Sequence, residues 1–312
     1  MDKTNSLKAK NIRIAVVDTG SNTIRLAIYE VEKDKKTSFK ELLDKKNVAG
    51  LSAYVKDGIF SDAGTEKAST VLKDHIKRAN NLKCEHIFVF GTAVLRNCKN
   101  SASVKREIEQ EIDCKIEILS SQEEAQLGIK GALHKTDIDS GIMIDLGGGS
   151  CEVTNFDRGV YDGTSLPFGC VSTYAKYISE ILPTEKEYKL LSNDISKIVF
   201  NSEIAVERDN KNLYGIGGSV RAIAKMLASL QGIARPSKTF NRSELELLEK
   251  LLFDDTSKFA HTLVSSNADR LHSFVPGMVI IKTIMEYLQK DTLSICKWGL
   301  REGYLLSKLE KI

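Results

Sequence analysis

The sequence predicts an α/β protein built from two duplicated domains with mixed sheets. Two observations support this prediction. Strand-like apolar runs that end in Gly-rich turns recur at nearly the same offset in both halves of the chain. In each half, three strand-like segments come first, and alternating helix and strand patterns follow them. The 312 residues are enough for two medium-sized domains.

The first pair of matching segments is the clearer one. The segment "AVVDTGSNTIRLAIYE" (15–30) aligns with "IMIDLGGGSCEVTNFD" (142–157), which places Asp18 and Asp145 127 positions apart. In both copies an apolar run precedes the aspartate, and a second strand-like run follows the turn. We therefore expect a buried strand, a tight turn and a second strand in each half.

A second pair of segments has almost the same offset. The segment "IFVFGTAVLR" (87–96) aligns with "LYGIGGSVRA" (213–222), and Gly91 and Gly217 are 126 positions apart. Gly-rich turns between strands are common, so one match alone would not indicate a repeat. Two matches at nearly one offset favour internal duplication.

The patterns also predict the individual elements and the domain limits. In the first half we expect strands at 12–18, 24–32, 38–48, 86–90 and 115–119, and helices at 62–82, 101–112 and from 122. In the second half we expect strands at 141–146, 151–156, 160–166, 212–216 and 292–296, and helices within 169–203, from 219, near 241–253, near 276–289 and at 300–310. The predicted domains are 11–127 and 128–312, with the last helix able to pack back on the first domain.

Composition excludes several classes of protein. The 45 Lys and Arg against 42 Asp and Glu leave a net charge of +3, which does not favour DNA or a membrane surface as a partner. No apolar run approaches the roughly 20 residues of a membrane helix, and residues 1–10 suggest a disordered lead-in. The six cysteines form no CxxC pair, which is typical of reduced thiols in a cytoplasmic protein.

The Gly-rich turns suggest phosphate binding. Glycine permits backbone conformations that direct successive N–H groups at one anion, and hydroxyl and amide side chains add donors. The candidates on the two turns that follow the aspartates are Gly20, Ser21, Asn22, Thr23, Gly147, Gly148, Gly149 and Ser150. A third turn, with Gly217, Gly218 and Ser219, gives a weaker signal because it lacks the G-x-G-x-x-G spacing of a dinucleotide site.

The two aspartates would repel phosphate unless a cation lies between them and the anion. Mg²⁺ prefers one or two carboxylates together with phosphate oxygens, so Asp18 and Asp145 are candidate ligands. The alternative is a local Asx-turn in which each side chain bonds its own loop. Thr92 and Arg96 follow the strand at 86–90, and Arg96 is either a phosphate ligand or a solvated surface arginine.

The segment "SSQEEAQLGIKGAL" (120–133) predicts a helix with Ser121 as its N-cap. Glu123 and Glu124 then fall in the first turn, where acidic residues also simply favour the helix dipole. The functional alternative is that one of these carboxylates faces a cleft between the domains as general base for an attacking water. Gly128 and Gly131 weaken the helix, and we expect close packing against the neighbouring domain to explain them.

An ordered series of motifs extends over nearly the whole chain. The motifs are "VVDTGSNTIRLAI", "GTAVLRN", "EEAQLGIKGA", "IDLGGGSCEV", "LPFGCV", "GIGGSVRAI", "FVPGMVII" and "LREGYLL". This series resembles the exopolyphosphatase / guanosine pentaphosphate phosphohydrolase family. The resemblance implies two ribonuclease H-like domains of the actin-like ATPase type, with mixed sheets that flank an interdomain cleft.

The resemblance also implies roles for individual residues. Glu124, directly before the alanine of "EEA", matches the catalytic carboxylate of the family. Asp145 matches a position associated with Mg²⁺, and Glu152 matches a nearby acidic position. Asn22, Arg25 and Arg96 match phosphate-contacting motifs. The implied metal is Mg²⁺, with Mn²⁺ as the alternative.

The implied activity is hydrolysis of the terminal phosphoanhydride of inorganic polyphosphate, which releases orthophosphate. Guanosine pentaphosphate is the alternative substrate, and an ATP-dependent kinase or a phosphate sensor of the same fold is the alternative from another class. The implied partners are the substrate and, as an open alternative, a second copy in a homodimer.

Three features depart from the family pattern. Gln126 stands where many members have arginine, and Cys151 stands where threonine or serine is usual. Longer members continue past "LREGYLL" into a helical region with an HD-like module, whereas the sequence ends at Ile312. That region is linked to gripping long chains, so processive action on long polyphosphate is not expected from the sequence.

Overall fold

A computed structural model describes residues 11–32, 35–202, 204 and 212–312, so the lead-in predicted for 1–10 lies outside the described residues. The chain forms two compact units. The first unit extends to Leu119 and includes Tyr304–Ile312, and the second comprises Ser120–Gly303. The end of the chain thus belongs to the first unit, and the division falls before residue 120, whereas the predicted domain limit follows residue 127.

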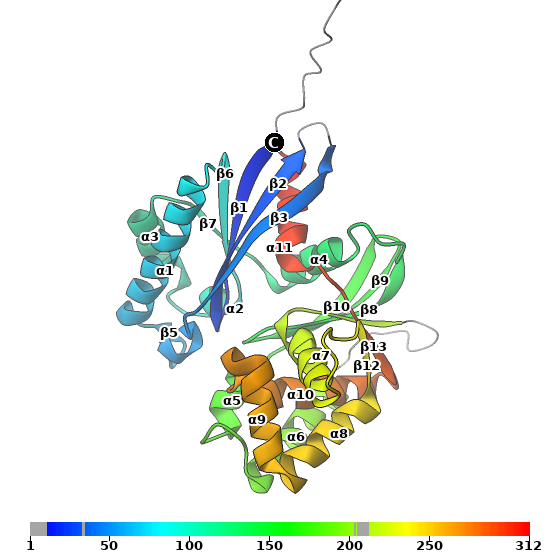
Figure 1. The fold of residues 1–312 in the computed structure, drawn as a ribbon. Coiled ribbons are helices and arrows are strands. Elements are labelled where there is room, and N and C mark those ends of the chain that lie inside the picture. The colour runs from blue at the N-terminus through cyan, green and yellow to red at the C-terminus, as the bar shows by residue number, and fades with distance from the viewer. Residues whose placement is uncertain (1–10, 33–34, 203, 205–211) are drawn as a thin grey trace, which may run out of the picture. The chain divides into compact units, whose positions relative to one another are not determined.

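The first unit contains a five-stranded mixed sheet in the order β3-β2-β1-β6-β7 (Figure 1). The strands are β1 (Ile12–Thr19), β2 (Thr23–Glu32), β3 (Lys35–Val48), β6 (His86–Gly91) and β7 (Ile116–Ile118). The first three pair antiparallel, while β6 is parallel to β1 and to β7. The β-branched residues of β1 are buried on both faces of the sheet, which is why this strand is a continuous apolar run.

Two helices cover one face of this sheet, as Figure 1 shows. They are α1 (Asp62–Asn81) and α3 (Ser101–Ile112). Their apolar residues pack with the β1 and β2 side chains in a single core. On the other face, the ring of Tyr304 lies 4.6 Å from that of Phe90 and thereby anchors α11 (Leu300–Leu309) to β6.

The smaller elements of the first unit lie in its connections. They are a 3₁₀ turn (Leu51–Tyr54), the hairpin of β4 (Val55–Lys56) and β5 (Ile59–Phe60), and α2 (Ala93–Arg96). Ser61 caps α1 by accepting a hydrogen bond from the Gly64 N–H.

The second unit repeats the sheet topology of the first. Its order, β10-β9-β8-β11-β13-β12, matches β3-β2-β1-β6-β7 strand for strand and adds β12 at the edge. The strands are β8 (Ser140–Leu146), β9 (Cys151–Asp157), β10 (Val160–Leu166), β11 (Leu213–Ile216), β12 (Thr239–Asn241) and β13 (Thr292–Ile295). The predicted duplication and the predicted mixed α/β sheets are therefore confirmed.

The second unit has the larger helical part. Its helices are α4 (Ser121–Ala132), α5 (Cys170–Tyr177), α6 (Glu185–Asn201), α7 (Gly218–Leu230), α8 (Arg242–Asp254), α9 (Thr256–Asn267) and α10 (Phe274–Tyr287). A short 3₁₀ turn (Ala268–Arg270) connects α9 to α10. Helix α10 is buried along almost its whole length, which explains why its sequence is apolar without a polar stripe.

The structure also corrects the predicted elements at several places. It contains α2, α9, β12 and the hairpin of β4 and β5, none of which was predicted. Helix α10 begins at Phe274, ahead of the predicted start at Pro276, because proline is tolerated in the first turn of a helix.

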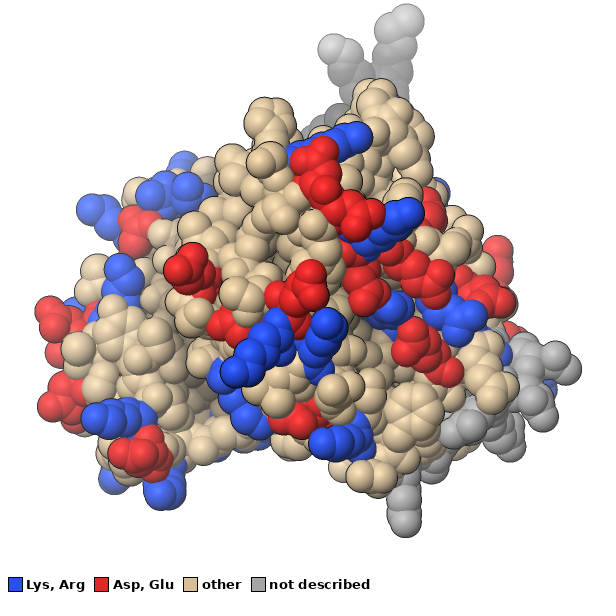
Figure 2. All heavy atoms as spheres, turned by 90° about the horizontal axis from the view of Figure 1, so that it is seen from below, with Lys and Arg blue, Asp and Glu red and all other residues tan. Residues whose placement is uncertain are grey.

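No helix among the described residues is long and apolar enough to cross a membrane. All six cysteines are free thiols, as the sequence predicted. Figure 2 shows acidic and basic side chains interspersed over one face of the molecule, in agreement with the small net charge.

Candidate functional site

The two Gly-rich turns have the same backbone hydrogen bond. The Gly20 N–H donates to the Thr23 carbonyl over 3.0 Å, and the Gly147 N–H donates to the Ser150 carbonyl over 3.0 Å. Each bond closes the turn between the first two strands of its sheet. The sequence match between these turns therefore corresponds to a match in backbone structure.

A second hydrogen bond is also repeated, at the end of the next parallel strand. The Thr92 hydroxyl donates to the Thr19 carbonyl over 3.5 Å, and the Ser219 hydroxyl donates to the Leu146 carbonyl over 3.5 Å. In each unit, this bond connects the turn after β6 or β11 to the end of the strand that bears the aspartate. In each unit, the predicted polar residues therefore lie together at the carboxyl ends of the parallel strands of its sheet.

Helix α5 lies against the triple-glycine turn. The Cys170 N–H donates to the Gly147 carbonyl, and the Val171 and Ser172 N–H groups donate to the Gly148 carbonyl, over 2.9–3.0 Å. A Cβ atom at Gly169 would overlap the backbone of Gly148. The first N–H groups of α5 therefore hold the turn in place instead of binding an external anion.

The carboxylate of Asp145 lies between two glycines of neighbouring elements. A Cβ atom at Gly217 would lie 3.1 Å from Asp145 Oδ1, and one at Gly128 would lie 3.5 Å from Oδ2. Gly217 also has a φ of +91°, which side chains rarely permit. Asp145 is therefore enclosed by α4 on one side and by the turn between β11 and α7 on the other.

The N-cap of α4 distinguishes its two glutamates. Ser120 is the N-cap, not Ser121 as predicted, and it forms a capping box with Glu123. The Glu123 N–H donates to the Ser120 hydroxyl over 3.2 Å, and the Ser120 N–H donates to the Glu123 carboxylate over 2.8 Å. The next residue, Glu124, has no part in this cap and is only 7% exposed.

Glu124 and Gly128 are one helical turn apart, so they lie on the same face of α4. Because Gly128 faces Asp145, the buried Glu124 lies on the side of α4 that is directed toward Asp145. The second unit therefore brings together the predicted catalytic carboxylate, the predicted metal ligand and the triple-glycine turn.

Glu152 is the direct cross-strand neighbour of Asp145. The two residues are paired in the antiparallel register of β8 and β9, so both side chains point to the same face of the sheet. Glu152 is buried, and its carboxylate accepts a hydrogen bond from the Ser165 hydroxyl over 3.0 Å. Burial and the nearby charges of Glu152 and Asp145 raise the pKa of the Cys151 thiol.

This pair of carboxylates fits a hard divalent cation. Mg²⁺ takes oxygen ligands and commonly uses only one or two carboxylates, with water and phosphate completing its octahedron. Among the described residues, no group of three or more His, Cys, Asp and Glu is arranged as a complete metal centre.

Arg270 is a site residue that the sequence analysis did not identify. Its guanidinium lies against Gly218 at the start of α7, where a Cβ atom would overlap it. The positive charge of Arg270 opposes the effect of burial on the pKa of the Cys170 thiol, which shows that it also lies near the start of α5. The 3₁₀ turn before α10 provides this arginine, and no motif around it indicated phosphate.

The remaining predicted residues lie in the first unit. Arg25 is opposite Asp18 in the register of β1 and β2, and its guanidinium is ion-paired with Asp44. Arg96 donates to the Leu119 carbonyl over 2.8 Å and is half-buried. The Asn22 carbonyl accepts two N–H groups of the following loop. Both arginines thus have protein partners within their own unit.

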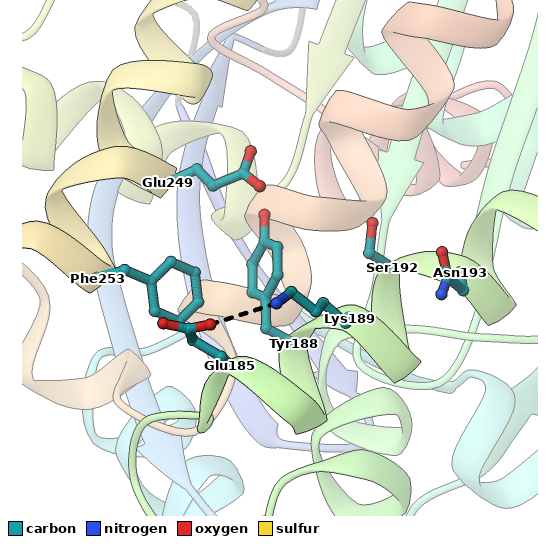
Figure 3. A pocket seen from close by; sticks show the side chains of 7 residues that line it. All are labelled: Glu185, Tyr188, Lys189, Ser192, Asn193, Glu249 and Phe253. Atoms are coloured by element: carbon teal, nitrogen blue, oxygen red, sulfur yellow. Dashed lines mark hydrogen bonds and ion pairs between the residues drawn. The ribbon is translucent and has the colours of Figure 1, made fainter.

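A separate cavity of about 380 Å³ lies between α6 and α8 (Figure 3). Tyr188 and Phe253 form an edge-to-face pair there, with ring centroids 5.1 Å apart, and Glu185 is ion-paired with Lys189. None of the predicted site residues lines this cavity. This cavity is therefore separate from the residues gathered around Asp145.

The fold resembles that of several solved structures. An exopolyphosphatase from Cytophaga hutchinsonii has a TM-score of 0.82 at 18% identity and covers 96% of this chain and 98% of its own. A Ppx/GppA family member from Aquifex aeolicus has a TM-score of 0.74 at 21% identity, covering 97% of this chain and 99% of its own. These similarities confirm the predicted two-domain fold.

The family follows from the sequence comparison. The model of the Ppx/GppA phosphatase family matches residues 28–312, so the chain belongs to this family. Exopolyphosphatase 1 of Mycobacterium tuberculosis is 23% identical over 96% of this chain and 89% of its own length. The guanosine-5'-triphosphate,3'-diphosphate pyrophosphatase of Pseudoalteromonas translucida is 27% identical over 98% of this chain and 61% of its own. The predicted family and the predicted class of enzyme, a phosphatase of phosphoanhydride bonds, are confirmed.

Proposed function

We propose that this protein is a cytoplasmic exopolyphosphatase that hydrolyses the terminal phosphoanhydride of inorganic polyphosphate. The observation that supports this most directly is the position of Glu124. It is buried on the face of α4 directed toward Asp145, while the neighbouring Glu123 is used by the helix cap. A buried carboxylate beside an anion-binding turn is suited to act as a general base.

In the proposed reaction, Glu124 takes a proton from a water molecule, whose oxygen attacks the terminal phosphorus. The bond between this phosphorus and the bridging oxygen breaks, and the shortened chain leaves with the electron pair. The N–H groups of Gly148, Gly149 and Ser150 would hold the phosphate oxygens, and Arg270 adds a positive charge at the start of α7. Thr92, Arg96 and the first turn stay predicted phosphate contacts of the first unit.

We also propose that Asp145 and Glu152 hold Mg²⁺, or alternatively Mn²⁺, with Asp18 as a further predicted ligand. When bound, the ion would neutralise charge on the phosphate oxygens and orient the substrate. The support is the pairing of two carboxylates on one face of the sheet. Like charges directly opposite each other on a sheet repel, and a cation bound by both carboxylates would offset this repulsion.

Guanosine pentaphosphate is the second candidate substrate. One relative that covers nearly this whole chain is named for a pyrophosphatase activity on guanosine-5'-triphosphate,3'-diphosphate. The terminal phosphoanhydride of guanosine pentaphosphate is the same reacting group as the end of a polyphosphate chain. The same residues would therefore act on both substrates.

The decisive experiment compares Glu124→Gln with Glu123→Gln. Glutamine can replace glutamate in a capping box, so the second variant keeps the helix cap and serves as the matched control. We expect phosphate release from polyphosphate to fall by about 10²–10⁴-fold for Glu124→Gln and to change little for Glu123→Gln. Full activity of Glu124→Gln would disprove the assigned mechanism.

A substrate panel tests the class of activity. It contains short polyphosphate, long polyphosphate, guanosine pentaphosphate and ATP, each with and without Mg²⁺. We expect Mg²⁺-dependent release of orthophosphate from polyphosphate. Turnover of ATP only in the presence of an acceptor would indicate a kinase, and binding of guanosine tetraphosphate without any turnover would indicate a sensor.

A further inference from the structure

Helix α4 contains two glycines that lie against other parts of the second unit. A Cβ atom at Gly128 would lie 2.9 Å from Ile216 Cδ1, closer than real Cβ contacts. Both glycines are in helical backbone, so space and not φ excludes a side chain here. The predicted packing of these glycines against the neighbouring domain is wrong, because their nearest neighbours belong to the same unit.

The second glycine forms a backbone-to-backbone contact with the start of α11. A Cβ atom at Gly131 would lie 2.7 Å from the Gly303 nitrogen, and one at Gly303 would lie 2.9 Å from the Gly131 nitrogen. A Cβ atom at Gly303 would also overlap the Leu127 carbonyl oxygen. Small residues allow two helices to approach this closely, and any side chain at this crossing would force them apart.

These contacts hold α4 at two successive points along its axis. Glycine costs about 1 kcal/mol relative to alanine inside a helix, so two glycines make α4 intrinsically weak. The two glycines allow α4 to approach β11 and α11 closely, and alanine at these positions would not. Glu124 lies one turn before Gly128, at the end of α4 that these contacts orient.

We propose that Gly128, Gly131 and Gly303 are positioning residues that set how closely α4 approaches Asp145 and thereby place the Glu124 carboxylate. This inference rests on the proposed hydrolysis by Glu124. A displacement of about 1 Å in a catalytic group can cost about 10²-fold in rate. A methyl group at Gly131 or Gly303 would meet backbone atoms and cause a displacement of that order, and one at Gly128 would press on the end of the Ile216 side chain.

The first test is Gly128→Ala with its rescue by Ile216→Val. Removing Cδ1 of Ile216 removes the atom that the new methyl group would meet. We expect kcat for phosphate release to fall by about 10–100-fold in Gly128→Ala with KM nearly unchanged, and to recover in the double variant. The matched control is Gly299→Ala, whose Cβ would lie at an ordinary 3.6 Å from Ile216 and should leave kcat unchanged.

The second test places Gly303→Ala in the Glu124→Gln background. If the glycine acts through Glu124, its substitution should reduce kcat strongly in the wild type and by less than about 3-fold in the background variant. Multiplying losses would indicate general structural damage and overturn the proposal. If Gly303→Ala does not fold, the rescue of Gly128→Ala by Ile216→Val still tests the positioning role.

The outcomes separate the two proposals. An active wild type, an inactive Glu124→Gln and a fully active Gly128→Ala would overturn the positioning role alone. A drop in Gly128→Ala that Ile216→Val does not restore would also overturn it. A wild type that releases no phosphate from any substrate, or a fully active Glu124→Gln, would remove the proposed function and the positioning role together.

Discussion

The two Gly-rich turns have the same backbone and different charge. In both, the glycine that follows the aspartate by two residues closes the turn with a 3.0 Å hydrogen bond. The residue opposite the aspartate, however, is Arg25 in the first unit and Glu152 in the second. The first aspartate thus faces a positive charge provided by the protein, and the second faces another negative charge.

This difference bears on where the proposed cation would bind. Asp18 lies opposite Arg25, whose guanidinium is ion-paired with Asp44, whereas Asp145 lies opposite a second carboxylate, Glu152, on the same face of the sheet. The duplicated backbone preserves the turn in both units, and one substitution at the opposite position changes its chemistry. The second turn is therefore the stronger candidate for the metal.

The two turns also differ in the N–H groups that donate hydrogen bonds to their carbonyls. In the first unit, the N–H groups of Ala49, Gly50 and Ser52 donate to the carbonyls of the turn. In the second unit, the start of α5 has that function. The helix after the parallel strand also differs, with four residues in α2 and thirteen in α7. The longer α7 gives the second turn a neighbouring helix N-terminus, beside which Arg270 lies.

The comparison predicts that the two aspartates differ in importance. We expect Asp145→Asn to reduce phosphate release on the order of 10²–10³-fold, because it would remove a proposed metal ligand. Asp18→Asn is the matched variant in the other copy, and we expect a much smaller loss. Steady-state rates at saturating Mg²⁺ test this, and equal losses would contradict the assignment of the metal to the second turn.

The second-largest expected effect concerns Glu152, the residue opposite Asp145. Glu152→Gln should raise the Mg²⁺ concentration required for half-maximal activity by about 10-fold or more, since it removes one of two carboxylates. A titration of activity with Mg²⁺ measures this shift. Asp44→Asn, which alters the ion pair of Arg25 in the first unit, serves as the control and should leave the titration unchanged.

Substitution of Arg270 tests whether the arginine beside the start of α7 contributes to substrate binding. We expect Arg270→Ala to weaken substrate binding by about 1.5–3 kcal/mol, the usual loss when a charged hydrogen-bond partner is removed. Arg270→Lys should recover only part of this, because lysine lacks the planar fork. Substrate titrations measure both variants, and an unchanged KM in Arg270→Ala would exclude contact with phosphate.

The smallest expected effect concerns stability in the first unit. His75 is fully buried, with Nε2 3.4 Å from the Ile24 carbonyl, and Nδ1 has no hydrogen-bond partner among the described residues. Burial lowers the pKa of His75 below 6.5. The unfolded chain then binds more protons than the folded protein, so stability falls as the pH decreases from about 6.5.

Thermal unfolding between pH 7 and pH 5 measures this effect. We expect the decrease in Tm on acidification to be smaller in His75→Gln than in the wild type, although His75→Gln is less stable at pH 7. An identical pH dependence in the two proteins would show that His75 does not contribute.

Much of the fold could be predicted from the sequence because local patterns specify it. Apolar runs and Gly-rich turns predicted most of the strands and helices within a few residues. The elements that were missed are short or depend on neighbours. Strand β12 has three residues and exists only because it pairs with β13.

The site could be predicted in part. Glu124 and Asp145 stand in motifs with a characteristic order, and the structure places them on neighbouring elements of one unit. Arg270 could not be predicted, because its contact with Gly218 depends on the connection between α9 and α10. The N-cap of α4 was misplaced by one residue, since Ser120 and Ser121 are equally suitable in isolation.

The sequence by itself determined the duplication, the mixed α/β class and the glycine turns, because these depend on residue type and on spacing along the chain. Only the tertiary structure decided which glutamate is buried toward Asp145, which residue stands opposite each aspartate, and why α4 contains glycine. These properties depend on strand register and on the distance between packed elements. No local pattern encodes either quantity, because both arise from contacts between residues far apart in the chain.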